Sequence, residues 1–207
     1  MPGGSSVQES RSLGGEGRDK VRAFIKNGGG YIGTCAGLCL LMESASHHPD
    51  MLGVVPFRFA SGAGGYADAP VYFNSRAKDL AGIEKGVRHI RYAQGPVPLP
   101  SMPVDGAEIE VVATYASDIN PRSTTRRSLA GEAAAVAGTF GKGKIFALAV
   151  HPEYDFDDHD IFVGAFRYVC GRELKWNISQ RRQGMRAAAV VCDDSFGVKS
   201  ANEIVRL

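Results

Sequence analysis

The sequence lacks the features that define several classes of protein. Its 207 residues include only 4 cysteines and 1 tryptophan. Four cysteines are too few for a disulfide framework in a chain of this length, and the sequence has no CxxC pair of the kind that forms zinc sites. A formal net charge of +2 excludes the strongly basic surface of a dedicated nucleic-acid binder. No run of about 18 apolar residues could span a membrane, and Met1–Ser6 lacks the basic and apolar regions of a signal peptide. These absences predict a protein of a reducing, cytoplasmic compartment with neither nucleic acid nor membrane as partner.

The residues that are present predict one α/β domain. The chain is 44% hydrophobic and contains 26 glycines, which indicates a substantial core with many tight turns. Periodicity predicts helices over 18–27, from Ala36 onward and from about Phe162 to Gly171, and strands over 54–59, 71–73, 87–92, 108–115, 133–140 and 144–150. Gly141-Lys142-Gly143 predicts a hairpin between the last two strands. The proline-rich stretch 95–100 cannot be a central strand and is predicted to be a surface loop near a functional face.

A cysteine occupies the turn between a short strand and a helix. Cys35 stands in Gly33-Thr34-Cys35-Ala36-Gly37, after the apolar residues Tyr31-Ile32. This is the arrangement of a nucleophile elbow, in which flanking glycines remove side chains that would clash at a sharp turn. The helix N-terminus favours the thiolate, and the Ala36 N–H is free to donate to an oxyanion. The alternative is a buried structural cysteine in a glycine-rich turn.

A histidine and a glutamate follow a second apolar strand. His151-Pro152-Glu153 comes directly after Ile145–Val150. A histidine at the end of a strand can reach a nucleophile at the end of a neighbouring strand, and a glutamate two residues later can orient the imidazole. The pattern is that of a nucleophile, a base and an orienting carboxylate. A histidine and a glutamate that merely share a loop are the alternative for this motif alone.

The acidic stretch after this motif has a simpler interpretation than a metal site. Asp155, Asp157, Asp158 and Asp160 precede a predicted helix. Carboxylates at that place are more often capping charges that favour the helix dipole. No metal site and no cofactor are therefore predicted.

Together these residues resemble a known superfamily. Gly33–Gly37 and His151–Glu153 are similar to the motifs of the class I glutamine amidotransferase-like superfamily. The longer string Gly28–Gly37, preceded by Pro2-Gly3-Gly4, resembles the biotin-protein ligase N-terminal domain family. The resemblance covers about residues 1–154 and is strongest at Cys35 and at His151-Pro152-Glu153.

This resemblance implies a fold, a site and a class of reaction. The implied fold is a flavodoxin-like three-layer α/β sandwich with a mostly parallel central sheet, plus an antiparallel hairpin region, over a single domain of residues 1–207. Cys35 is the implied nucleophile, His151 the base and Glu153 the orienting group, with the backbone of Gly3, Gly4 and Ala36 as oxyanion hole. The implied activity is amide hydrolysis or amidotransfer through a thioester, on a small-molecule amide or related substrate, with a biotin ligase or a synthase as possible partner.

The sequence also departs from the pattern of true glutaminases. Their further glutamine-binding residues are not identifiable, and Tyr92-Ala93-Gln94-Gly95-Pro96 has one glycine where the family leads us to expect two. An alternative function is a catalytically silent ligand-binding or regulatory module related to the biotin-protein ligase N-terminal domain. A redox or glyoxalase-type cysteine protein of similar fold is a third alternative.

The ends of the sequence predict an unusual chain order. Ala187–Cys192 is an apolar run typical of a strand buried on both faces, and Ser200–Glu203 matches a capping box before a short helical stripe. Residues 185–207 are therefore expected to supply the first strand and helix of the same sheet, beside the Cys35 strand. Two explanations are open. Either the chain is circularly permuted, or the order of its segments differs from the native order and a segment between Leu207 and Met1 is missing. The alternative is a C-terminal extension packed on the outside.

Overall fold

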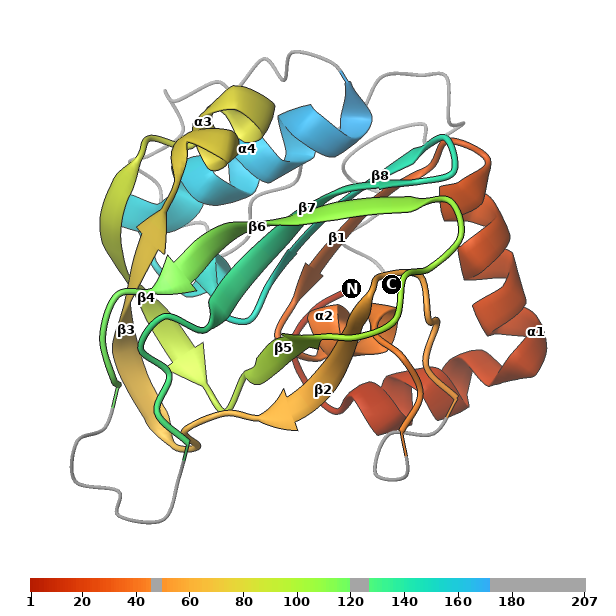
Figure 1. Ribbon diagram of the computed structural model, residues 1–207, viewed down its shortest axis with the longest axis horizontal. Helices are drawn as coiled ribbons and strands as arrows, with labels where there is room; N and C mark the ends of the chain where they lie inside the picture. The colour runs from red at the N-terminus through yellow and green to blue at the C-terminus, as the bar shows by residue number, and fades with distance from the viewer. Residues whose placement is uncertain (46–49, 120–126, 172–207) are drawn as a thin grey trace, which may run out of the picture. The chain divides into compact units, whose positions relative to one another are not determined.

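The fold is a mixed α/β arrangement of helices around one curled sheet (Figure 1). The computed structural model describes residues 1–45, 50–119 and 127–171. Its helices are α1 (Ser6–Lys26), α2 (Ala36–Leu41), α3 (Ser75–Ala81) and α4 (His159–Cys170), with the 3-10 turns η1 (Pro152–Tyr154) and η2 (Phe156–Asp158). Its strands are β1 (Gly30–Thr34), β2 (Phe57–Ser61), β3 (Tyr66–Phe73), β4 (Gly86–Ala93), β5 (Pro96–Pro100), β6 (Ala107–Tyr115), β7 (Ala133–Phe140) and β8 (Gly143–Leu148). Within these ranges, no helix has the length and apolar character needed to cross a membrane.

The main sheet has six strands in the order β1-β8-β7-β6-β3-β4. Only β1 and β8 pair in parallel, and the other four neighbouring pairs are antiparallel. The prediction of a mostly parallel sheet is therefore wrong for the described strands. The reason is their connections: the predicted Gly141-Lys142-Gly143 hairpin joins β7 to β8, and strands joined by a tight turn can pair only antiparallel. The flavodoxin-like three-layer fold stays a prediction.

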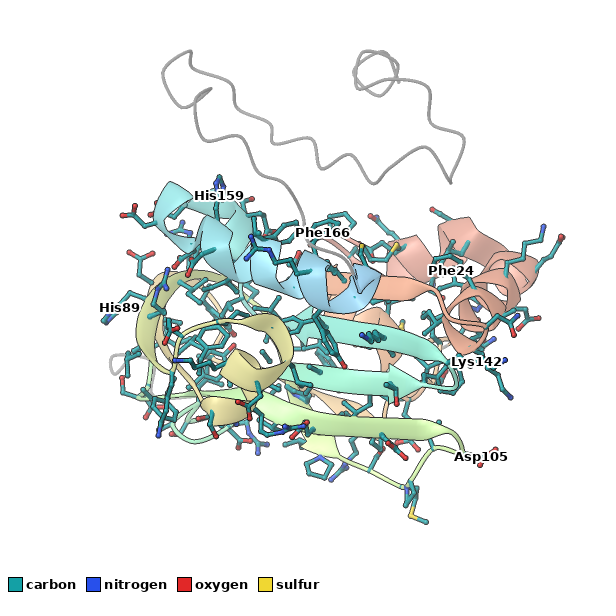
Figure 2. The ribbon with its side chains drawn as sticks, turned by 90° about the horizontal axis from the view of Figure 1, so that it is seen from above. Phe24, His89, Asp105, Lys142, His159 and Phe166 are labelled. Atoms are coloured by element: carbon teal, nitrogen blue, oxygen red, sulfur yellow. The ribbon has the colours of Figure 1, made fainter. Side chains whose placement is uncertain are left out.

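Helices and a small second sheet cover the two faces of the main sheet. Helices α3 and α4 pack on one face, and α2 with the two-stranded β2-β5 sheet packs on the other (Figure 1). Strand β7 is buried along almost its whole length because both of its faces are covered. Figure 2 shows Lys142 and Asp105 at one end of the sheet, and His89 and His159 at the opposite end.

The proline-rich stretch is a strand, which corrects the predicted surface loop. Strand β5 pairs antiparallel with β2, and Pro96, Pro98 and Pro100 alternate with Val97 and Leu99. Side chains and N–H directions both alternate along a strand, so every missing N–H faces the same edge of this short sheet. Val97 and Leu99 remain available for pairing. The prolines therefore restrict β5 to an edge without preventing the strand.

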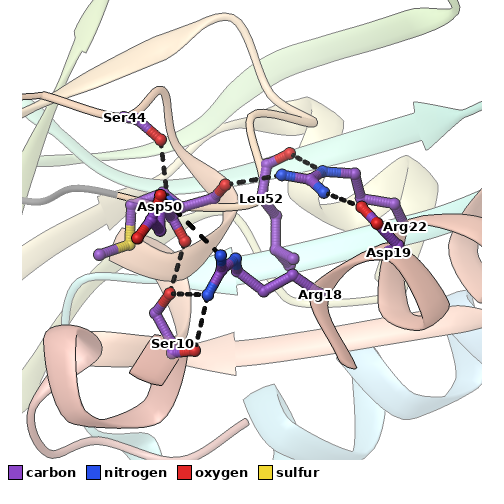
Figure 3. A network of polar contacts seen from close by, with 8 residues as sticks. Ser10, Arg18, Asp19, Arg22, Ser44, Asp50 and Leu52 are labelled. Atoms are coloured by element: carbon purple, nitrogen blue, oxygen red, sulfur yellow. Dashed lines mark hydrogen bonds and ion pairs between the residues drawn. The ribbon is translucent and has the colours of Figure 1, made fainter. Parts of the chain in front are cut away.

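Helix α1 begins much earlier than the predicted helix over 18–27. Its N-cap is Ser5, and the chain kinks at Gly14 (φ 64°, ψ −178°), where a helical backbone is interrupted. Polar contacts join the two sides of this kink to each other and to the segment Asp50–Leu52 (Figure 3). The Arg18 guanidinium donates to the Ser10 carbonyl (3.0 Å), and Arg22 Nε donates to the Leu52 carbonyl (2.6 Å). The glycines in the first half of α1 weaken its helical pattern in the sequence, and one of them, Gly14, forms the kink.

The N-terminal residues lie along β1. The Met1 amine donates to the Ile32 carbonyl (2.8 Å), and the Thr34 N–H donates to the Met1 carbonyl (3.1 Å). These two bonds flank Gly33, which is the pattern of a parallel strand pair. Pro2–Gly4 consequently passes the end of β1 where Cys35 follows. The segment 185–207, predicted to lie beside this strand, is outside the described residues.

Candidate active site

The ends of two parallel strands bring the predicted cysteine and histidine to the same edge. Strands β1 and β8 pair in register, with Thr34 opposite Leu148. The Cys35 N–H continues the pairing by donating to the Leu148 carbonyl (2.8 Å). Because parallel strands end at the same side of a sheet, Cys35 after β1 and His151 after β8 come together. This is the only parallel pair in the main sheet of the described residues.

Cys35 has the backbone conformation of a sharp elbow. It caps α2 with φ 49° and ψ −103°, one of three non-glycine residues with positive φ among the described ones. Such a conformation costs on the order of 1–3 kcal/mol and persists at functional sites, where the surrounding structure enforces it. Its thiol lies 3.7 Å from the Ala93 carbonyl oxygen, to which it can donate. Cys35 is buried, with 7% of its surface exposed.

The two glycines of the cysteine motif are required by close backbone contacts. A Cβ at Gly33 would stand 2.7 Å from the carbonyl carbon of Gly37, and a Cβ at Gly37 would stand 2.4 Å from the Met1 carbonyl oxygen. Real Cβ atoms do not approach backbone atoms so closely. The motif predicted from the sequence therefore has a steric basis on both sides of Cys35.

Glu153 holds the ring of His151 from the expected side. Nδ1 of His151 lies 2.8 Å from Oε1 of Glu153, and the same oxygen accepts a hydrogen bond from Thr34 Oγ1 (3.1 Å). The His151 N–H donates to the Arg91 carbonyl of β4 (2.8 Å), which fixes the backbone. The motifs do not single out Thr34, although its place directly before Cys35 makes it a neighbour of the site.

The second ring nitrogen of His151 is buried and faces the site. Among the described residues, Nε2 has no hydrogen-bond partner. Burial alone would lower the pKa of this histidine, but the Cys35 sulfur and then the Glu153 carboxylate favour the protonated ring more strongly. The pKa of His151 is thereby raised from 6.5 to about 9. The ring is therefore able to hold a proton near Cys35 at neutral pH.

This raised pKa predicts a pH-dependent stability. The folded state binds the proton more tightly than the unfolded state, so the stabilisation is complete below pH 6.5 and is lost as the pH rises through about 9. We expect the free energy of unfolding to fall by up to about 3 kcal/mol between pH 6 and pH 9.5. Urea unfolding across this range measures the change. His151→Gln should flatten the curve, and parallel curves for the two proteins would contradict the assignment.

Of the residues expected to form the oxyanion hole, Gly3 lies against the same ring. A Cβ at Gly3 would stand 2.3 Å from Cε1 of His151, so the Gly3 backbone lies directly against the imidazole. Gly4 has φ 150°, a conformation that favours glycine. Ala36 is the first residue of α2, so its N–H has no partner within the helix.

The neighbouring thiol, Cys39, differs from Cys35 in its surroundings. It lies one turn further along α2 and is 6% exposed. Burial, followed by the proximity of Cys35, raises the pKa of Cys39 to about 12. Since the thiolate is the reactive form, Cys39 is a poor nucleophile at neutral pH.

The missing second glycine has a structural counterpart next to Cys35. Gln94 has φ 55°, the left-handed conformation that favours glycine, and a Cβ at Gly95 would stand 1.9 Å from the Ala149 carbonyl oxygen. The backbone at these two positions thus has the geometry for which two glycines are suited. Glutamine at 94 tolerates it at some cost in backbone strain.

The acidic stretch after Glu153 is not organised as helix caps alone. Asp158 is the N-cap of α4 but makes no capping hydrogen bond through its side chain. Instead, Asp158 and Asp160 pair with Arg88 of β4 at 3.3 and 2.9 Å. Among the described residues, no group of three or more metal-ligating side chains is found. Asp160 still stands in the first turn of α4, where its charge favours the helix dipole, and the ion pair with Arg88 additionally joins α4 to β4.

Comparison with known families identifies a similarity at the start of the chain. The family described as "Biotin-protein ligase, N terminal" matches residues 1–41. The match includes Gly3, Gly4, Cys35 and Ala36, but it ends before His151. A search of curated proteins gives no match.

Solved structures show a likeness in fold. PurLQS from Thermotoga maritima is 20% identical with a TM-score of 0.50, over 73% of this chain and 67% of PurLQS. A putative ThuA-like protein from Bacteroides uniformis is 13% identical with a TM-score of 0.50, over 75% of this chain and 64% of the other. A β-galactosidase from Rahnella sp. R3 is 19% identical with a TM-score of 0.46, over 72% of this chain. The chain spans 20% of that β-galactosidase's length.

Proposed function

We propose that the protein hydrolyses an amide through a Cys35–His151–Glu153 triad, as a member of the class I glutamine amidotransferase-like superfamily. The family match at residues 1–41 and the fold likeness to PurLQS, a glutamine amidotransferase, are compatible with this superfamily. The observation that carries the proposal is the contact of His151 with Glu153 at 2.8 Å beside a cysteine with φ 49°. These are the parts of an activated nucleophile.

The proposed reaction has two steps. The Cys35 thiolate adds to the amide carbon, and the carbonyl oxygen gains negative charge that the backbone of Gly3 and Gly4 and the Ala36 N–H stabilise. The carbon–nitrogen bond then breaks, its electron pair stays on nitrogen, and Nε2 of His151 gives that nitrogen a proton. Water attacks the resulting thioester while His151 removes a proton from the water, and the carbon–sulfur bond breaks to return the thiolate and a carboxylic acid.

Two proposed partners follow from the two possible fates of the nitrogen. Hydrolysis needs only a small-molecule amide and water. Transfer needs an acceptor, which we assign to a biotin ligase or synthase partner. The raised pKa of His151, about 9, suits the donation of a proton to the leaving nitrogen in either case.

Covalent labelling of Cys35 tests the proposal. The intact chain is treated with a glutamine-analogue diazoketone or with limiting iodoacetamide, and the modified peptide is identified by mass spectrometry. We expect the adduct on Cys35 before any on Cys39, because burial and the proximity of Cys35 raise the pKa of Cys39 to about 12 and so disfavour its reactive thiolate. Cys35→Ser serves as the control. Labelling of Cys39 first would contradict the nucleophile assignment, and a Cys35 that reacts with neither reagent would favour the catalytically silent module.

A further inference from the structure

An exposed aromatic ring lies directly against the proposed general acid. Tyr154 is 73% exposed, yet its ring contacts that of His151 edge to face, with centroids 5.4 Å apart and planes at 85°. The Tyr154 N–H lies 3.3 Å from the His151 carbonyl, to which it donates, so the η1 turn fixes its backbone next to the site. The reaction proposed above does not use this side chain.

The other contacts of the His151 ring show which of its atoms are already occupied. The Gly3 backbone lies against Cε1, and Glu153 lies at Nδ1. Nε2 is left without a partner among the described residues, and it is the atom that gives its proton to the leaving nitrogen. In the proposed reaction, a substituent on that nitrogen lies beside the imidazole from which the nitrogen takes its proton. Tyr154 is the exposed ring that contacts this imidazole.

The surroundings of the Cys35 thiol have a different character. There the Cys35 thiol meets the Ala93 carbonyl at 3.7 Å, and the buried Gly95 has no room for a Cβ beside Ala149. Backbone atoms thus lie at short range there. The surroundings of His151 instead combine a buried ring nitrogen, Nε2, with a tyrosine ring that solvent reaches.

We propose that Tyr154 is a specificity-determining residue that binds the leaving amine, and that the substrates are amides whose nitrogen carries a planar or apolar group. This inference rests on the proposed function. Ammonia, the leaving group of a primary amide, has no surface that an aromatic ring could contact. An aromatic amine can stack on Tyr154 while its nitrogen takes the proton from His151, and aromatic pairs of this kind change affinity by about three- to tenfold.

Paired substrates that share one acyl group test the inference. The kcat/KM of the full chain is measured for γ-glutamyl-4-nitroanilide, by absorbance, and for glutamine, by ammonia release. We expect Tyr154→Ala to lower the anilide-to-glutamine ratio about tenfold and Tyr154→Phe to preserve that ratio. Phe24→Ala, which removes a 50% exposed aromatic ring on α1, is the matched control and should preserve it too.

A second readout does not depend on turnover. The rates at which iodoacetanilide and iodoacetamide alkylate Cys35 are compared, and Tyr154→Ala should remove a preference for the anilide. Equal losses with both members of each pair, together with a shifted pH profile, would show that Tyr154 only positions His151 and would overturn the inference. A Cys35 that iodoacetamide does not alkylate would instead overturn the proposed function itself, and this inference with it.

Discussion

Replacing His151 with alanine is expected to lower the rate of amide hydrolysis by about 10³-fold. The imidazole both favours the Cys35 thiolate and supplies the proton that the leaving nitrogen needs, so both steps lose a participant. Nε2 is buried with no partner among the described residues, and Nδ1 is held by Glu153. Initial rates with γ-glutamyl-4-nitroanilide measure the loss, and circular dichroism measures whether the fold persists.

His89→Ala is the matched control for this experiment. His89 lies on β4 at the same end of the sheet as His159 (Figure 2) and is exposed. No contact in the proposed mechanism involves it, so its loss should change the rate less than twofold. If His151→Ala kept the rate within tenfold of the unmodified protein, His151 would not be the general acid and base.

The site was predictable from the sequence because its residues are concentrated in local motifs. The spacing around Cys35 predicted a strand, a turn and a helix, and the structure places β1, the elbow and α2 there. His151 and Glu153 follow the predicted strand, now β8. Two strands that run in parallel as neighbours place their following residues together, which needs no knowledge of the rest of the fold.

The contacts that support the site were not predictable in the same way. The hydrogen bond from Thr34 to Glu153 joins positions 119 residues apart. The packing of Gly3 on His151 joins the N-terminal residues to the segment that follows β8. Such contacts depend on the register between β1 and β8 and on the position of the N-terminal residues along β1. No periodicity or composition within either segment records them.

The architecture differed from expectation for a related reason. The resemblance to a superfamily implied a mostly parallel sheet, but hairpin connections such as β7–β8 make most pairs antiparallel. The stretch Pro96–Pro100 lacks three N–H donors because of its prolines, and so it does not match a strand pattern. In β5 the three prolines all present their nitrogen atoms to the same open edge, so the pairing with β2 is kept. The sequence pattern described each segment alone, whereas the pairing partners decided its structure.

Replacing Glu153 with glutamine is expected to lower the hydrolysis rate by about 10²-fold, the lower end of the contribution of general acid–base catalysis, because the imidazole remains but loses its orienting carboxylate. Glutamine keeps the size of the side chain but removes the charge that stabilises the protonated ring. Glu153 is one of the two groups that raise the pKa of His151 to about 9. The variant should therefore also lower the pKa of His151 towards 6.5, which titration of the imidazole proton signals by NMR measures.

Two substitutions at Thr34 test the hydrogen bond that supports Glu153. Thr34→Val removes the hydroxyl that donates to Oε1 of Glu153 at 3.1 Å, whereas Thr34→Ser retains it. Since a single hydrogen bond contributes about 1 kcal/mol, Thr34→Val should lower the rate about fivefold and Thr34→Ser should restore most of it. A Glu153→Gln variant that lost activity while the pKa of His151 stayed near 9 would show that the carboxylate orients the ring without stabilising its charge. If both the rate and this pKa were unchanged, Glu153 would have no part in the triad.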